Sequence, residues 1–233
     1  MRKTAKLFVC IAVLLGMQTN SQNALKLKYK NSQLYAGIDI GSKGVKLSVV
    51  EAAKNAAKTG AFNVVQESSI NTDFISFTRP TFSGTVNAVA KLYTTALNDY
   101  KIPADRIYTV VSSGIKEQAD REGKNALVTE LIDSLKKRTN DPNRMVPVID
   151  VIQEARLSHL SIIPNEKRYN TFLIDIGSGN TKGGYFPNGN TNVFKLFEVN
   201  WGTRSVTNAT EKRVGDDKSI SNFNKNLYRV LAG

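Results

Sequence analysis

The chain has 233 residues, of which 41% are apolar, 22% charged and 8% aromatic. This composition is typical of a soluble globular protein with one large domain or two small ones, and it excludes collagen, coiled-coil and wholly disordered chains. The formal net charge of +12 predicts a surface that attracts phosphate, nucleic acid or anionic lipid, and charge alone does not choose among the three.

Residues 1–24 are predicted to be a signal peptide. Three cations precede an apolar run at 7–17, and small and polar residues follow it. The run has about 11 residues, fewer than the roughly 20 that span a bilayer, so we expect export without a membrane span after cleavage, with a retained anchor as the alternative. Cys10, the one cysteine, lies in this run, so the mature chain is expected to have no disulfide. Residues 25–33 are expected to be a linker.

After the linker, the hydrophobic pattern predicts alternating strands and helices. Strands are expected at 34–40, 45–50 and 62–69, a helix at 85–100, a strand at 107–111 and a long helix at 116–138. A strand at 146–152 and a short helix at 154–161 follow. From residue 169 the pattern restarts, with strands at 171–176, 181–186 and 193–199 and a helix at 219–231. This order indicates an α/β fold with a mixed sheet.

The two halves of the chain, 34–165 and 166–233, open with closely similar segments. One reads GIDIGSKGVK and the other LIDIGSGNTK, so Asp39 and Asp175 each end a strand that runs into a glycine turn. Glycine lets several backbone N–H groups approach one anion, so a phosphate chain could rest on both turns. A carboxylate beside phosphate needs an offsetting charge, for which Mg²⁺ is the usual choice. One such segment is often an ordinary strand-to-turn junction, but its duplication favours a binding site.

These paired turns resemble the phosphate loops of the actin, sugar kinase and Hsp70 superfamily. Between them, the segment VIDVIQEARLSHL at 148–160, followed by the second turn, is similar to the exopolyphosphatase and guanosine pentaphosphate phosphatase family. The similarity covers residues 35–186, roughly two thirds of the chain. The resemblance implies an RNase H-like (actin-like ATPase) α/β fold with mixed sheets, the first half complete and the second half truncated.

The resemblance also implies roles for individual residues. Glu154, directly before Ala-Arg-Leu, would be the general base that activates water. Asp175 would assist that water or, with Asp39, hold Mg²⁺ or another divalent cation. The residues that would bind the phosphate chain of the substrate are Gly41, Ser42, Lys43, Gly44, Lys46, Gly177, Ser178, Gly179, Asn180 and Thr181. The reaction would release terminal phosphate from polyphosphate or guanosine pentaphosphate.

Some positions near the first turn depart from the family's pattern. Lys43 and Gly44 stand where Asn and Ser are usual, and Lys46 replaces an Arg. Glu117 stands where the family has an Arg that contacts phosphate, and a shift of one residue would place Lys116 there instead. If Lys116 does not reach the cleft, catalysis is in doubt.

The second half departs from the family as well. Lys182 replaces the usual Glu, a position that we interpret as peripheral. The half is also shorter than expected, which favours truncation over a reduced half or one completed by a partner. Arg204 is a candidate for a further phosphate contact, with a surface turn as the alternative.

We therefore expect an exported phosphoanhydride hydrolase of the exopolyphosphatase type. The alternatives are a non-catalytic module that binds phosphate or nucleotide, or assembles as actin does, and a non-catalytic surface protein. The expected partner is polyphosphate or a phosphorylated nucleotide, with homodimerisation left open; scattered aromatic residues argue against nucleic acid. His159, the sole histidine, is expected to be a packing or surface residue.

Overall fold

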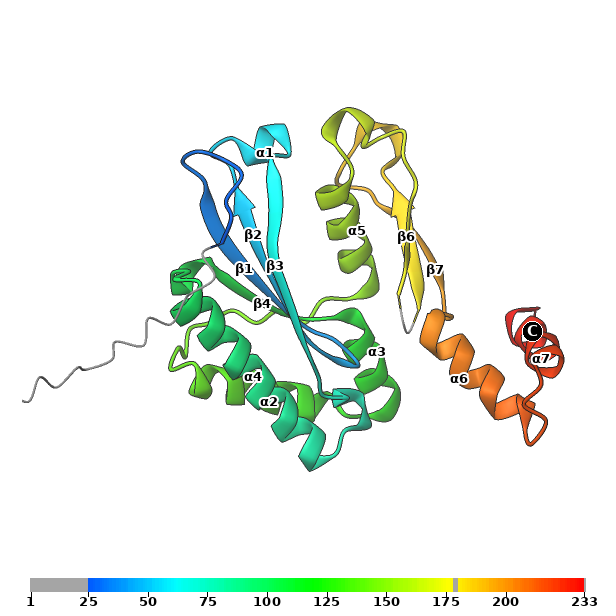
Figure 1. The fold of residues 1–233 in the computed structure, drawn as a ribbon. Coiled ribbons are helices and arrows are strands. Elements are labelled where there is room, and N and C mark those ends of the chain that lie inside the picture. Colours follow the sequence, from blue (N-terminus) through cyan, green and yellow to red (C-terminus); the bar gives the residue numbers. More distant parts are fainter. Residues whose placement is uncertain (1–24, 178–179, 233) are drawn as a thin grey trace, which may run out of the picture.

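The computed structural model describes residues 25–177 and 180–232, so the predicted signal peptide lies outside the described residues. The described chain forms two lobes, each built on its own β-sheet (Figure 1). We call residues 25–149 the first lobe and residues 150–232 the second lobe. Among the described residues, none of the helices combines the length and the apolarity needed to cross a bilayer.

The sheet of the first lobe has four strands in the order β3-β2-β1-β4. The strands are β1 (Gln33–Ile40), β2 (Gly44–Ala52), β3 (Phe62–Asn71) and β4 (Ile107–Val111). β1 pairs antiparallel with β2 and parallel with β4, so this sheet is mixed, as expected. Side chains alternate between the two faces of a strand, and Ile38 and Ile40 are fully buried while Asp39 lies on the opposite face.

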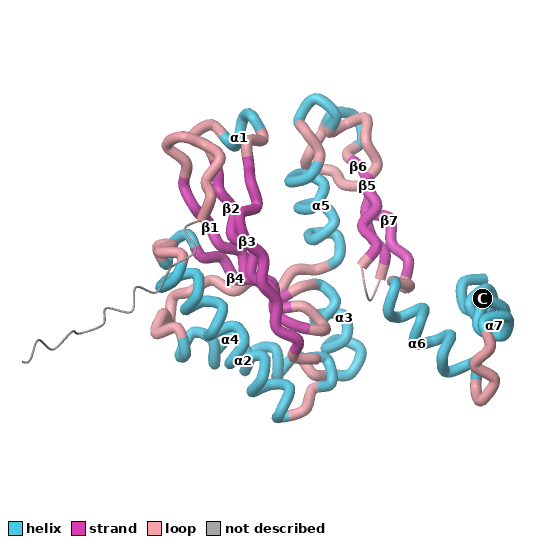
Figure 2. The backbone as a smooth tube through the Cα atoms, viewed as in Figure 1, coloured by secondary structure: helices cyan, strands magenta, loops and turns pink. Residues whose placement is uncertain are grey.

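Helices α2 (Arg79–Thr94) and α4 (Asn125–Arg138) cover the buried face of this sheet (Figure 2). α2 begins earlier than predicted, because Thr78 caps it, and it continues as a π-helical turn at Thr95–Asp99. The long helix predicted at 116–138 is wrong: it is divided into α3 (Ser113–Glu122) and α4 by Gly123, whose φ of 65° ends α3 in a left-handed cap. The shorter helices of this lobe are α1 (Ala56–Thr59), η1 (Phe74–Ser76) and η3 (Ala104–Arg106).

The strand predicted at 146–152 is also wrong. Val148 forms only an isolated parallel bridge with Val111 of β4. Asp150 then ends the extended segment, because its carboxylate accepts a hydrogen bond from the Gln153 amide and the Gln153 side chain bonds back to Asp150. This capping box begins α5 (Val151–Ile162) three residues before the predicted start of that helix.

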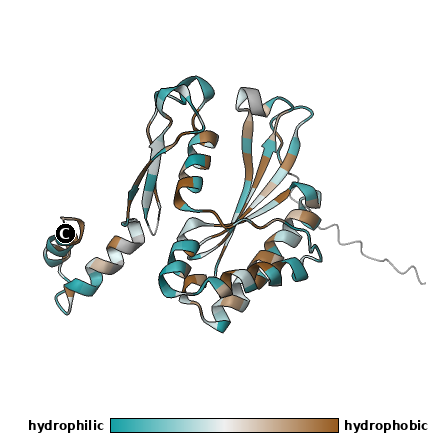
Figure 3. Cartoon of the chain, turned by 180° about the vertical axis from the view of Figure 1, so that it is seen from behind, coloured by the Kyte–Doolittle hydropathy of each residue, from teal (hydrophilic) through white to brown (hydrophobic). Residues whose placement is uncertain are grey.

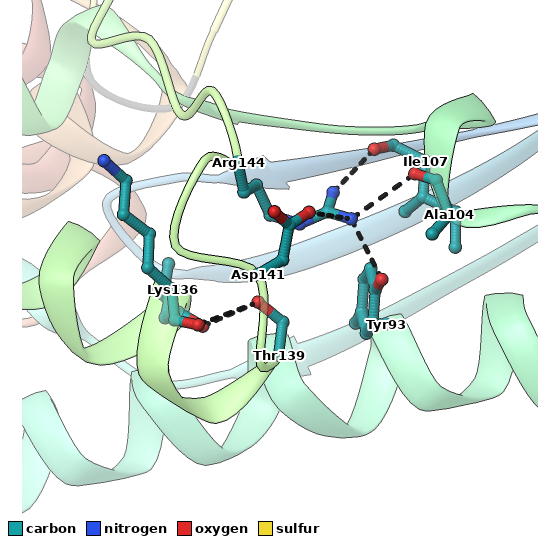
Figure 4. A network of polar contacts seen from close by, with 8 residues as sticks. Tyr93, Ala104, Ile107, Lys136, Thr139, Asp141 and Arg144 are labelled. Carbon is teal, nitrogen blue, oxygen red and sulfur yellow. Dashed lines mark hydrogen bonds and ion pairs between the residues drawn. The ribbon is translucent and has the colours of Figure 1, made fainter.

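A buried arginine fixes the connection between α4 and this extended segment (Figure 4). The guanidinium of Arg144 donates hydrogen bonds to the Ile107 carbonyl at 2.8 Å, the Tyr93 hydroxyl at 2.9 Å and the Ala104 carbonyl at 3.3 Å. It also pairs with Asp141 at 3.3 Å and lies over the Tyr93 ring. The planar guanidinium thus joins α2, the start of β4 and the loop after α4 in one network.

The start of the described chain is attached to the first sheet through Glu51, which is fully buried in β2. Its carboxylate accepts hydrogen bonds from the Lys28 amide, the Tyr29 amide, the Ser32 hydroxyl and the Asn63 side chain. Burial acts to raise the pKa of Glu51, but these four hydrogen bonds outweigh it and lower the pKa to about 2. The segment expected to be a linker is therefore held against the sheet by an ionised buried side chain.

The second lobe has a three-stranded antiparallel sheet in the order β5-β6-β7. Its strands are β5 (Leu173–Ile176), β6 (Thr181–Tyr185) and β7 (Lys195–Val199), and its short helices are η4 (Asn165–Lys167) and η5 (Pro187–Gly189). α5 packs on β6 and lies between the two sheets (Figures 1 and 3). α6 (Thr203–Val214), which the sequence pattern did not predict, follows β7 and packs against α7 (Ile220–Ala232).

The core of the second lobe is small. Ala155, Phe186 and Phe194 form its buried cluster, and the His159 ring meets both phenylalanine rings edge to face. His159 Nε2 lies 3.0 Å from the Thr171 carbonyl, to which it donates. Of the two roles expected for His159, packing or surface, the structure shows packing, because its side chain is fully buried.

Candidate active site

The two glycine turns of the repeat have the same local geometry. The Gly41 amide donates to the Gly44 carbonyl at 2.8 Å, and the Gly177 amide donates to the Asn180 carbonyl at 3.0 Å. In the first hairpin Asp39 lies opposite Lys46, and in the second Asp175 lies opposite Lys182. The sequence repeat is therefore a repeat of structure, with one acidic and one basic residue paired across each hairpin.

Glu154 lies in the first turn of α5 and contacts both lobes. Its Oε2 accepts a hydrogen bond of 3.1 Å from the amide of Ser113, the first residue of α3 in the first lobe. Its Oε1 lies 3.0 Å from the ammonium of Lys182, on β6 of the second lobe. The N-terminus of α3 is positively polarised and Lys182 carries a positive charge, so both contacts favour a carboxylate at this point. The predicted general base thus lies where the two lobes meet.

The interpretation of position 182 as peripheral is wrong. Only 7% of the Lys182 side chain is exposed, and its ammonium also lies 3.7 Å from Asp175 Oδ2. Because α5 packs on β6, the Lys182 side chain is enclosed between Glu154 and Asp175, the two predicted catalytic residues. Sequence reasoning missed this residue, although its place opposite Asp175 in the repeat would have been a usable signal.

Asp39 approaches the same region from the first hairpin. Its accessible area is that of an exposed residue, but partial desolvation of its carboxyl, followed by the nearby charge of Glu154, raises the pKa of Asp39 above its usual value. Lys46 and Lys182 act in the opposite direction. A Cβ atom on Gly41 would lie 3.9 Å from Asp39 Oδ2 and 4.0 Å from Ser112 Oγ, so the first turn, Asp39 and the start of α3 are neighbours.

Lys43 and Thr181 are both predicted to bind phosphate, but in the structure their side chains contact other groups of the protein. The ammonium of Lys43 pairs with Asp73 at 2.9 Å and is largely exposed. The Thr181 hydroxyl donates to the Trp201 carbonyl at 2.8 Å, so it joins β6 to the segment before α6.

The other predicted phosphate contacts lie in or beside the turns. Ser42 Oγ lies 2.8 Å from the position that a Cβ on Gly114 would occupy, which places it beside the start of α3. Lys46 is exposed, and the side-chain Nδ2 of Asn180 donates to Glu198 Oε1 at 3.5 Å. Ser178 and Gly179 lie outside the described residues, as does the side chain of Arg204.

Glu117 stands where a phosphate-contacting cation was expected, and the neighbouring Lys116 does not take over that role. Lys116 pairs with Asp120 on its own helix at 2.7 Å, and this hydrogen bond raises the pKa of Lys116. The carboxyl of Glu117 faces Glu198 of β7, and burial together with that second carboxyl raises the pKa of Glu117. The two lobes therefore meet here through two acidic side chains, with Lys182 among the charges that offset them.

The carboxylates of the site do not form a set of ligands for a divalent cation in this arrangement. The space between Glu154 and Asp175 is held by the ammonium of Lys182, which would repel a second cation. In the part of the chain that the structure describes, no group of three or more His, Cys, Asp and Glu side chains could hold a metal ion. Mg²⁺ stays a prediction, and the side chains around Lys182 do not fit it.

The sequence matches no protein-family model and no curated protein. Solved structures are similar in fold. A Ppx/GppA family member from Aquifex aeolicus is 20% identical with a TM-score of 0.59, over 86% of this chain and 60% of that chain. A type II variant structure of the Aquifex aeolicus Ppx/GppA phosphatase is 21% identical with a TM-score of 0.56, over 85% and 61%. An exopolyphosphatase-like protein is 19% identical with a TM-score of 0.54, over 84% and 58%.

The fold is that of the Ppx/GppA family. The resemblance inferred from the paired turns and the Glu-Ala-Arg-Leu segment is thereby confirmed at the level of the α/β fold. The expectation of mixed sheets holds for the first sheet, whereas the three described strands of the second are all antiparallel. The chain spans about 60% of the length of these structures.

Proposed function

We propose that this chain is an exported phosphoanhydride hydrolase that releases terminal phosphate from polyphosphate or guanosine pentaphosphate. The observation that carries the proposal is the position of Glu154, which is held between the two lobes by a donor from each. The similarity in fold to Ppx/GppA phosphatases supports it. Export is proposed from the cations and the apolar run within residues 1–24.

The chemistry requires one proton acceptor and several donors for charged oxygens. A water oxygen would attack the terminal phosphorus while the Glu154 carboxylate takes its proton, and the bond from that phosphorus to the bridging oxygen would break. Glu154 can serve here because each carboxylate oxygen keeps a free lone pair after its contact with Ser113 or Lys182. The amides of Gly41 and Gly44 close the first turn, so the backbone amides of Ser42 and Lys43 between them would stabilise charge on the phosphoryl oxygens.

A second candidate function is phosphate or nucleotide binding without turnover. Two observations favour it. Both oxygens of Glu154 already have partners, and an acidic Glu117 stands where the family has a phosphate-contacting cation. The same site would then bind a phosphate chain and leave it intact.

Phosphate release from long-chain polyphosphate separates the two functions. We expect Glu154→Gln to lower the rate about 100-fold to 10,000-fold, the range that general base catalysis contributes. Glu166→Gln, at an exposed carboxylate in η4, is the matched control and should release phosphate at the rate of the parent chain. Equal rates for the parent and Glu154→Gln would contradict the proposed hydrolysis, and polyphosphate binding with no release from either would support the binding module.

A further inference from the structure

The sequence repeat assigns no function to Lys182, although the structure encloses its ammonium. Its counterpart in the first hairpin, Lys46, is exposed, whereas α5 covers Lys182 and brings Glu154 to within 3.0 Å of it. Moving an ammonium out of water costs free energy unless carboxylates pair with it. The two carboxylates that do so are those predicted to act on the substrate, Glu154 and Asp175.

We propose that Lys182 supplies, as a fixed part of the chain, the positive charge that a divalent cation would otherwise supply between these carboxylates and a bound phosphate chain. The inference rests on the proposed function and deepens it, because it makes the binding of polyphosphate independent of a metal ion. The ligand class is an inorganic phosphate chain or the phosphate chain of a nucleotide, without a bound divalent cation.

The charges around Lys182 support this role. Its ammonium lies between Glu154 and Asp175, the charge of Glu154 also acts on Asp39, and a polyanion would be repelled by these carboxylates without a cation between. A Mg²⁺ ion needs oxygen ligands at about 2.0–2.1 Å and keeps several waters, so it would have to displace the ammonium from the two carboxylates it contacts. The amine cannot leave the site as a free ion can.

The donor count leaves room for a ligand. An ammonium carries three N–H donors. One is directed to Glu154 Oε1 at 3.0 Å, and a second faces Asp175 Oδ2 at the longer distance of 3.7 Å. The third is free to meet a phosphoryl oxygen, and the Asp175 contact is long enough to be exchanged for one.

The test measures binding of long-chain polyphosphate by titration calorimetry, in EDTA and in excess Mg²⁺. We expect the parent chain to bind equally in both, and Lys182→Met to bind about 10-fold to 100-fold more weakly, the loss expected for a hydrogen bond to a charged group. Lys195→Met, an exposed lysine of β7 in the same sheet, makes the same change of charge and should bind nearly as the parent does. Because Lys182→Met removes the counter-charge of Glu154 and leaves it only the Ser113 amide, the double variant Lys182→Met/Glu154→Gln provides a folded comparison.

A second arm titrates Mg²⁺ alone, without polyphosphate. The parent chain should give no binding heat and no thermal shift, whereas Lys182→Glu, which removes the ammonium and adds a carboxylate, should gain both. Polyphosphate binding that requires Mg²⁺ in the parent chain, or Lys182→Glu binding polyphosphate as the parent does in EDTA, would overturn the inference and leave the proposed function standing. Failure of the parent chain to bind polyphosphate under either condition would remove the proposed function itself.

Discussion

The carboxylate of Glu51 makes the stability of the first lobe depend on pH in a defined window. Its pKa is lowered from the usual 4.5 to about 2 in the folded chain, so the ionised form is favoured by folding. Its contribution is therefore fully present above about pH 4.5 and is lost as the pH falls towards 2. We expect the difference in melting temperature between the parent chain and Glu51→Gln to shrink across that window, as measured by circular dichroism.

The control for this prediction is Glu130→Gln, which removes a carboxylate that is 44% exposed and paired with Arg79 on the surface. Surface pairs contribute little, so its melting temperature should follow that of the parent at every pH. A constant difference between the parent and Glu51→Gln from pH 7 to pH 2 would contradict the assignment. The protection of the Lys28 and Tyr29 amides against hydrogen exchange, relative to an unstructured chain at the same pH, should fall in the same window, because those amides lose their ionised acceptor.

At the scale of single residues, the sequence predicted the acidic residues of the site but not Lys182, the cation that pairs with them. Glu154 and Asp175 are recognisable because each lies in a local segment with its own pattern. Lys182 becomes important only through contact with Glu154, which lies on another element, and no local pattern contains that information. The same is true of Glu117 and Glu198, which face each other from α3 and β7.

The position of the general base depends on one element, α5, and on the cap that begins it. Asp150 and Gln153 form the capping box, and Glu154 directly follows Gln153. Replacing an N-cap by Ala typically costs about 1 kcal/mol. We expect Asp150→Ala to lower the free energy of unfolding by that amount in urea denaturation and to slow phosphate release, because the first turn of the helix frays.

The matched variant Asp150→Asn keeps a capping side chain and should retain most of both properties. Loss of phosphate release without loss of stability in Asp150→Ala would instead give Asp150 a part in the chemistry.

The same cap explains why a strand was wrongly predicted at 146–152. The β-branched residues before Asp150 favour a strand, but the capping box commits the chain to a helix from Val151.

Over the whole molecule, the two lobes bury equivalent residues to very different extents. Ile40 and Ile176 occupy the same position in the two hairpins, each directly before the glycine that begins the turn, yet Ile40 is 0% exposed and Ile176 is 65% exposed. α2 and α4 cover the buried face of the first sheet, whereas Ile174 and every residue of β7 are also exposed in the second.

This asymmetry gives a direct test. Ile40→Ala should cost about 2–5 kcal/mol of unfolding free energy, because it leaves a cavity in a packed core. Ile176→Ala should change it by no more than about 0.5 kcal/mol. Urea denaturation of the two variants would check both, and a large loss for Ile176→Ala would show that its side chain is covered in solution. The sequence predicted the duplication but not this difference, because burial depends on which helices fold over each sheet.

Glu154 is carried by a helix that packs on one lobe, while one of its two partners, the Ser113 amide, belongs to the other. A movement that separates the lobes would take the carboxylate away from α3 and leave it with Lys182 alone. The two-donor environment of Glu154 therefore exists only while the lobes keep this spacing, so the behaviour of this one side chain depends on the arrangement of the whole chain and not on α5 alone.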